Sequence, residues 1–137
     1  MKSLTLVTFT FAALFFGAGC AQNSNPKDTK LLAQQNPGQF VSIGNHTVKG
    51  GVKIETRNDG SYLVIDDNFN STAGPDLRLV LRDSSGNSQM QIVAPLAKTQ
   101  GSQEYLLDLD SSLLNQFNEV AVYCAKFHVD FGIAKIR

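Results

Sequence analysis

Hydrophobic and polar residues alternate with a period of two along most of the chain. Val48, Val52 and Ile54, for example, occupy even positions between polar residues and glycines. This period places successive side chains on opposite faces of a β-strand. Short segments of this kind recur with turn residues between them, at the spacing of about 8–12 residues that is typical of β-sandwiches and barrels. The candidate strands are residues 40–43, 48–55, 61–65, 77–81, 89–93, 105–109, 119–124 and 129–131.

The connecting segments support the same fold class. Asn58–Asp59–Gly60 is a strong turn signal and predicts a hairpin between the second and third candidate strands. Residues 66–76 form a polar loop, and Ser111 and Ser112 are expected to cap one helical turn. We therefore predict an all-β fold, a small antiparallel sandwich or barrel-like domain of about seven to nine strands.

The first twenty residues have the pattern of an export signal. Lys2 is followed by the apolar run 4–16 and by small residues up to Ala21. That run is too short to span a membrane and is typical of a secretory signal. Ala18–Gly19–Cys20 resembles the end of a bacterial lipobox, in which the cysteine is acylated; the alternative is cleavage after Ala21. We expect residues 1–20 to be the signal, 21–38 a flexible tether and 39–137 the β domain.

Composition narrows the possible partners. Twelve Lys and Arg balance twelve Asp and Glu in 137 residues, and only 18% of the residues are charged. Such a balance excludes the broad basic surface of a nucleic-acid-binding protein. The expected location is the cell envelope, either anchored in the membrane through a lipid on Cys20 or free in the periplasm or medium. In both cases Cys124 remains as the single thiol.

Cys124 is the first candidate for chemistry. It shares strand parity with Val120 and Val122, which predicts burial, and buried cysteines are normally unreactive. A functional thiol would need exposure or a nearby cation such as Lys126. His128 invites a Cys–His nucleophile pair, but in one straight strand the two residues would lie about 13 Å apart. Its parity instead predicts a solvent-facing side chain, so a hydrolase is disfavoured.

Two further groups could bind a cofactor or metal. His46 precedes a strand and could ligate a metal or haem, although a lone histidine at a strand edge is more often structural. Asp66, Asp67 and Asp76 place carboxylate oxygens in one loop, as a calcium site requires, but Asx turns explain such loops equally well. The chain has no Cys-x-x-Cys-His motif for covalent haem and no zinc spacing.

Three segments in order resemble the DM-thirteen domain, an all-β module of extracellular redox proteins. The resemblance covers about residues 38–137, and its most specific part is the closing one. The matching motifs are His46–x–Val48–x–Gly50–x–Val52–x–Ile54, Leu63–x–Ile65, Asp67–x–Phe69, Gly74–Pro75–Asp76–Leu77 and Val122–Tyr123–Cys124–x–x–Phe127–x–Val129–x–Phe131–Gly132–x–Ala134.

The resemblance implies electron transfer through Cys124, as a bare thiol or as a haem ligand. Beside it, His46 stays a candidate for cofactor binding from its own position in the sequence. The resemblance also implies a separate redox partner, either a protein or a small-molecule donor or acceptor, and a non-enzymatic role. The family commonly has Trp before this cysteine, where this chain has Tyr123. The alternative hypothesis is a cell-surface binding or adhesion domain in which Cys124 is only packed.

Overall fold

The computed structural model describes residues 37–85 and 90–137. The expected signal segment, Cys20 and all of the expected tether except Pro37 and Gly38 lie outside these residues. Gly38, expected to end the tether, already pairs with Val52 in a sheet. In the described part of the chain, no helix has the length and apolar character needed to cross a membrane.

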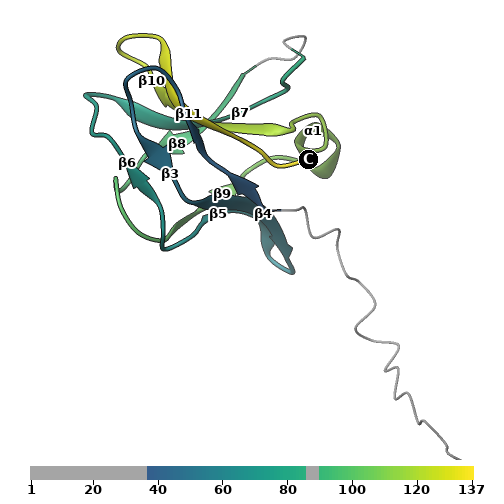
Figure 1. The fold of residues 1–137 in the computed structure, drawn as a ribbon. Coiled ribbons are helices and arrows are strands. Elements are labelled where there is room, and N and C mark those ends of the chain that lie inside the picture. The colour runs from purple at the N-terminus through teal and green to yellow at the C-terminus, as the bar shows by residue number, and fades with distance from the viewer. Residues whose placement is uncertain (1–36, 86–89) are drawn as a thin grey trace, which may run out of the picture. The chain divides into compact units, whose positions relative to one another are not determined.

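The described residues form two antiparallel sheets and one short strand pair (Figure 1). The four-stranded sheet contains, in spatial order, β1 (Gly38–Gln39), β4 (Gly51–Arg57), β5 (Gly60–Ile65) and β9 (Gln103–Leu107). The five-stranded sheet contains β2 (Val41–Ser42), β11 (Val129–Lys135), β10 (Glu119–Cys124), β7 (Leu77–Arg82) and β8 (Gln91–Pro95). The separate pair is β3 (Val48–Lys49) with β6 (Asn70–Ser71).

The predicted all-β antiparallel sandwich is confirmed. The described residues contain eleven strands rather than seven to nine. The difference comes from two-residue strands such as β6, which lies in the segment expected to be a polar loop. A strand of two residues has no measurable alternation, so it leaves no periodic signal in the sequence.

The core lies between the two sheets and follows the predicted alternation. In the four-stranded sheet Ile54 is opposite Leu63, and in the five-stranded sheet Val122 is opposite Leu79. All four side chains are at most 3% exposed. Full burial of an aliphatic side chain is worth about 1.5–3 kcal/mol, so this row of pairs is the main source of stability.

The turns show one confirmed prediction and one correction. Asn58 and Asp59 form the turn of the β4–β5 hairpin, as predicted. The helical turn is α1 (Ser111–Leu114), but its N-cap is Asp110 and not Ser111 or Ser112. The Asp110 carboxylate accepts the Leu113 N–H at 2.9 Å. An ionised carboxylate at this position also interacts favourably with the helix dipole, which a serine hydroxyl cannot do.

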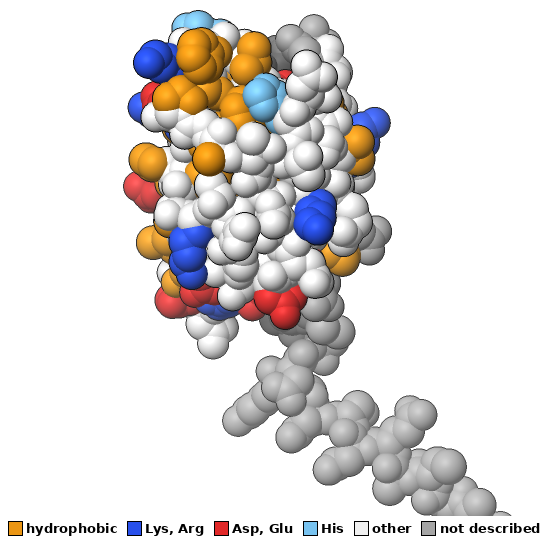
Figure 2. All heavy atoms as spheres, turned by 60° about the vertical axis from the view of Figure 1, so that its left-hand side comes forward, with side chains coloured by type: hydrophobic (Ala, Val, Ile, Leu, Met, Phe, Trp, Pro, Cys, Tyr) orange, Lys and Arg blue, Asp and Glu red, His pale blue; other side chains and the backbone are white. Residues whose placement is uncertain are grey.

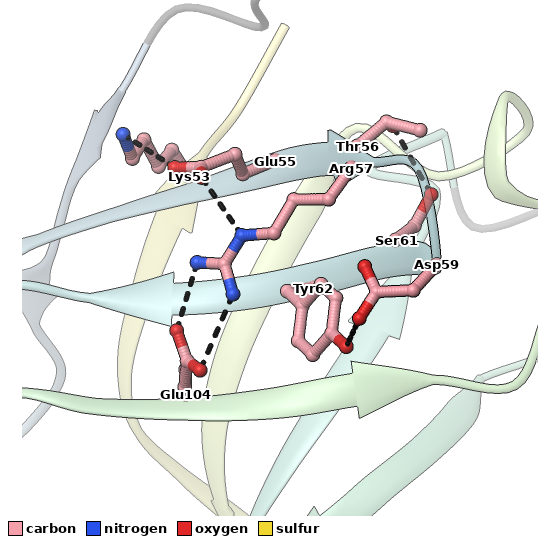
Figure 3. A network of polar contacts seen from close by, with 8 residues as sticks. All are labelled: Lys53, Glu55, Thr56, Arg57, Asp59, Ser61, Tyr62 and Glu104. Carbon is pink, nitrogen blue, oxygen red and sulfur yellow. Dashed lines mark hydrogen bonds and ion pairs between the residues drawn. The ribbon is translucent and has the colours of Figure 1, made fainter.

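The outer face of the four-stranded sheet carries a row of charges (Figure 3). The Arg57 guanidinium donates to Glu55 at 2.9 Å and to both carboxylate oxygens of Glu104, at 2.9 and 3.3 Å. The hydrogen bond from Arg57 lowers the pKa of Glu104. The same guanidinium lies 4.4 Å from the centre of the Tyr62 ring. These contacts are solvated, so they contribute little to stability and keep this face polar.

The outer face of the five-stranded sheet has a more buried ion-pair network. Arg82 donates to Glu119 at 2.6 Å and to Asp130 at 2.9 and 3.2 Å. Only 6% of the Glu119 side chain is exposed. Burial lowers the pKa of Arg82, but the hydrogen bonds to Asp130 and Glu119 outweigh it and the pKa is raised. One cation thus holds two carboxylates from β10 and β11 against β7.

Replacing Arg82 by Met should lower the free energy of unfolding by about 2–3 kcal/mol, because Glu119 would remain buried without its cation. Urea unfolding followed by far-UV circular dichroism measures this change. Arg57→Met is the matched control, since it removes a guanidinium that pairs two solvated carboxylates, and it should cost much less. Equal losses in the two variants would show that the Arg82 network contributes no more than a surface ion pair.

Candidate redox site at the end of strand β10

Cys124 is the last residue of β10 and lies opposite Leu77 of β7 and Val129 of β11. Its side chain is 0% exposed and belongs to the hydrophobic core cluster, which confirms the burial predicted from strand parity. Four surface hollows of the described residues are lined by other side chains. In this conformation, therefore, neither an oxidant nor a partner sulfur can touch Sγ.

A four-residue turn, 125–128, separates Cys124 from β11. The Ala125 N–H donates to the Asp76 carbonyl at 2.9 Å, and the next three side chains are exposed. Phe127 is 60% exposed, and Lys126 Nζ lies 5.8 Å from the centre of its ring. The turn breaks the strand parity that would have placed Lys126 on the face of Cys124, so this cation points to solvent and not to the sulfur.

His128 interacts with Tyr123 rather than with Cys124. The Tyr123 hydroxyl and His128 Nδ1 are 2.9 Å apart. His128 has a backbone φ of 55°, the only positive value of a non-glycine residue in the described chain. The predicted solvent-facing position of His128 is confirmed. A Cys–His nucleophile pair is not formed, because one side chain is buried and the other is exposed.

His46 is a packing residue in this structure. Its ring stacks on the Phe131 ring with the centroids 3.5 Å apart and the planes at 7°. Phe131 is 3% exposed and lies at the irregularity of the β10–β11 register, between the pairs Tyr123–Asp130 and Val122–Gly132. The His46 imidazole thus covers the core ring of Phe131, and one face of the imidazole is occupied by this contact. Figure 2 shows both histidine side chains beside exposed hydrophobic side chains.

The comparison with protein families decides the identity of the domain. The family model described as Electron transfer DM13 matches residues 39–136. The chain belongs to this electron-transfer family. Searches of curated proteins and of solved structures each returned no match. The DM13 match covers every described strand except the first residue of β1, so the whole sandwich is the DM13 domain.

The haem ligation considered for DM13 domains does not fit the residues of this chain. A thiolate ligand must face a space wide enough for a porphyrin, whereas Cys124 Sγ is enclosed by the core. The enclosed sulfur therefore does not fit a haem thiolate ligand in this conformation.

The three aspartates considered for calcium have separate roles in this DM13 domain. Asp66 accepts the Gly51 N–H at 2.7 Å and the Asn68 N–H at 3.1 Å, as an Asx turn does. Asp76 forms two hydrogen bonds with Arg78, and Asp67 is exposed. Among residues 37–85 and 90–137, no three His, Cys, Asp or Glu side chains are grouped as a metal site.

The Tyr123–His128 contact was not predicted from the sequence. The two residues are five positions apart, and a straight strand would place them far from each other. The left-handed backbone at His128 closes the turn and returns its ring to Tyr123. Histidine is one of the residues that occupy this region more often than others, and this preference is the one signal present in the sequence.

Replacing Cys124 should destabilise the domain in a graded way. Cys124→Ala leaves a small cavity and should cost about 1–2 kcal/mol. Cys124→Ser nearly keeps the side-chain volume but buries a hydroxyl among apolar side chains, and this burial should lower the free energy of unfolding by about 1–3 kcal/mol. Urea unfolding of the two variants and the wild type measures the order. Wild-type stability in both variants would mean that the sulfur is not a packed core group.

Proposed function

We propose that this DM13 domain is exported, held at the membrane by a lipid on Cys20, and transfers electrons through Cys124. The family match over residues 39–136 carries the proposal. The cysteine content supports it further, since the chain has two cysteines and only Cys124 lies in the matched region. The partner is a separate redox protein or a small-molecule donor or acceptor.

A buried thiol can react only if the protein opens locally. The position of Cys124 favours this, because it ends its strand and is followed by a turn whose side chains are exposed. Outside the strand pairs, a backbone hydrogen bond from Ala125 to Asp76 ties the start of this turn. Local opening of such an end costs less free energy than global unfolding. The open state would expose Sγ while the two-sheet core stays formed.

The chemistry of the open state is thiol–disulfide exchange. Cys124 loses its proton to water, and the thiolate attacks one sulfur of a partner disulfide. The partner's S–S bond breaks, its second sulfur leaves as a thiol after taking up a proton, and a mixed disulfide forms. One thiol of a donor dithiol then attacks Cys124 Sγ in this mixed disulfide, and the partner leaves with both of its sulfurs as thiols. The donor's second thiol attacks the donor sulfur now bonded to Cys124, which forms the donor disulfide and restores the Cys124 thiol. Two electrons pass from the donor thiols to the partner disulfide, so each turnover regenerates the domain.

Native-state labelling tests whether Cys124 becomes accessible by local opening. We expect a chromogenic aromatic disulfide to react slowly, with a rate that rises with urea much less steeply than global unfolding does. The matched control is Val122→Cys in a Cys124→Ala background, since Val122 faces the same core two residues further from the turn. The control thiol should react only with the full urea dependence of global unfolding.

An equal, full urea dependence for Cys124 and the control thiol would contradict the proposal. It would favour the second candidate function, a non-catalytic binding or adhesion domain at the cell surface. The observation in favour of this candidate is the 0% exposure of the sulfur, which is what packing alone requires.

The lipid anchor is tested separately. Mass spectrometry of the protein from the bacterial envelope should give an N-terminus at Cys20 that carries acyl chains. A single chain binds a membrane only marginally, so stable anchoring needs more than one. An unmodified N-terminus at Gln22 would exclude the anchor and leave the redox proposal untouched.

A further inference from the structure

We propose that Tyr123 and His128 form a second redox site, at which the loss of one electron from the Tyr123 phenol is coupled to proton transfer to His128. The inference rests on the proposed electron-transfer function and adds a one-electron site to it. The 2.9 Å contact between the Tyr123 hydroxyl and His128 Nδ1 carries it.

The chemistry needs a base at the phenol. A phenol that loses an electron becomes a strong acid, so oxidation is easier when a base accepts the proton at once. A base must lie within hydrogen-bond reach, about 2.6–3.2 Å, and His128 does. Neutral imidazole with its proton on Nε2 offers Nδ1 as the acceptor.

The step is balanced between the pair and an outer-sphere one-electron oxidant. The electron passes from the phenol to the oxidant, the O–H bond of Tyr123 breaks, and the proton forms an N–H bond at Nδ1 of His128. The products are a neutral tyrosyl radical, an imidazolium and the reduced oxidant. A one-electron reductant reverses the step, and the proton returns to the phenol oxygen.

The other charged side chains near Tyr123 are engaged elsewhere, so none of them accepts the phenol proton in place of His128. Arg78 of β7 and Asp130 of β11 lie directly opposite Tyr123 in the sheet. Arg78 pairs with Asp76, and Asp130 pairs with Arg82, so both charges are compensated. Lys126 in the turn is the remaining nearby cation, and it lies towards Phe127. His128 is thus the group that faces the phenol oxygen.

A second observation points to the same pair. His128 has a φ of 55°, a region that costs free energy for a residue with a side chain and that is often kept where geometry serves a function. The positive φ closes the β10–β11 turn so that the imidazole returns to the phenol.

The other two tyrosines lack this arrangement, and they serve as controls. Tyr62 donates to the Asp59 carboxylate at 2.9 Å, a much weaker base, and the Arg57 cation over its ring opposes loss of an electron. Tyr105 donates to the amide oxygen of Gln103 at 2.6 Å, which accepts no proton. The chain has no tryptophan, so its three tyrosines are the only phenol or indole side chains that an oxidant can attack.

The test is stopped-flow oxidation of the full chain by hexachloroiridate(IV), with freeze-quench electron paramagnetic resonance to detect the tyrosyl radical. We expect Tyr123→Phe to remove the fast radical signal and Tyr62→Phe to leave it unchanged. His128→Gly, which accepts the positive φ, should slow the reaction about 100-fold. Added imidazole should restore part of the rate in His128→Gly and in no other variant.

Two results would overturn the inference. One is a radical that persists in Tyr123→Phe, and the other is a His128→Gly rate that equals the wild type. Cys124→Ala separates the inference from the proposed function. If Cys124→Ala keeps the fast radical but loses disulfide exchange, both the thiol function and the tyrosyl site are supported. If Cys124→Ala loses disulfide exchange but Tyr123→Phe keeps the radical, the thiol function stands and the tyrosyl site is rejected. If Cys124→Ala exchanges disulfides at the wild-type rate, the thiol function is rejected and the tyrosyl site is judged on its own results.

Discussion

Burial of the inward side chains of β10, the strand that lies between β7 and β11 in its sheet, is the interaction on which the rest of the domain depends. Val120, Val122 and Cys124 point from this central strand into the core, and each is 0% exposed. Their partners on β7 are also core residues, so the sheet and the interior are built by the same contacts. The thiol is therefore first a packed group, and any redox role must use a conformation in which the end of this strand loosens.

Two side chains on the other face of β10 are polar and hydrogen-bonded. Glu119 pairs with Arg82, and Tyr123 contacts His128. One strand thus carries a core thiol on one face and a hydrogen-bonded phenol on the other, one residue apart. The Cys124 thiol therefore reacts only after local opening of the strand end, whereas the Tyr123–His128 pair already lies at the surface.

Much of this could be predicted from the sequence, because alternation reports which face of a strand is buried. The burial of Cys124 and the hairpin at Asn58–Asp59 follow from patterns within a few residues. The helix cap at Asp110 was missed, since serines next to it satisfy the same local rule. The Tyr123–His128 contact depends on one backbone angle, and the Arg82–Glu119 pair joins residues 37 positions apart. Neither leaves a local pattern.

The most direct test of the central claim is the oxidation state of Cys124 in the cell. Protein is recovered from the envelope under oxidising and reducing growth conditions, with free thiols blocked at lysis, and Cys124 is examined by peptide mass spectrometry. The account predicts a mixed disulfide on Cys124 that increases under oxidising conditions and disappears on reduction. Cys124 found as an unmodified thiol under both conditions would contradict it.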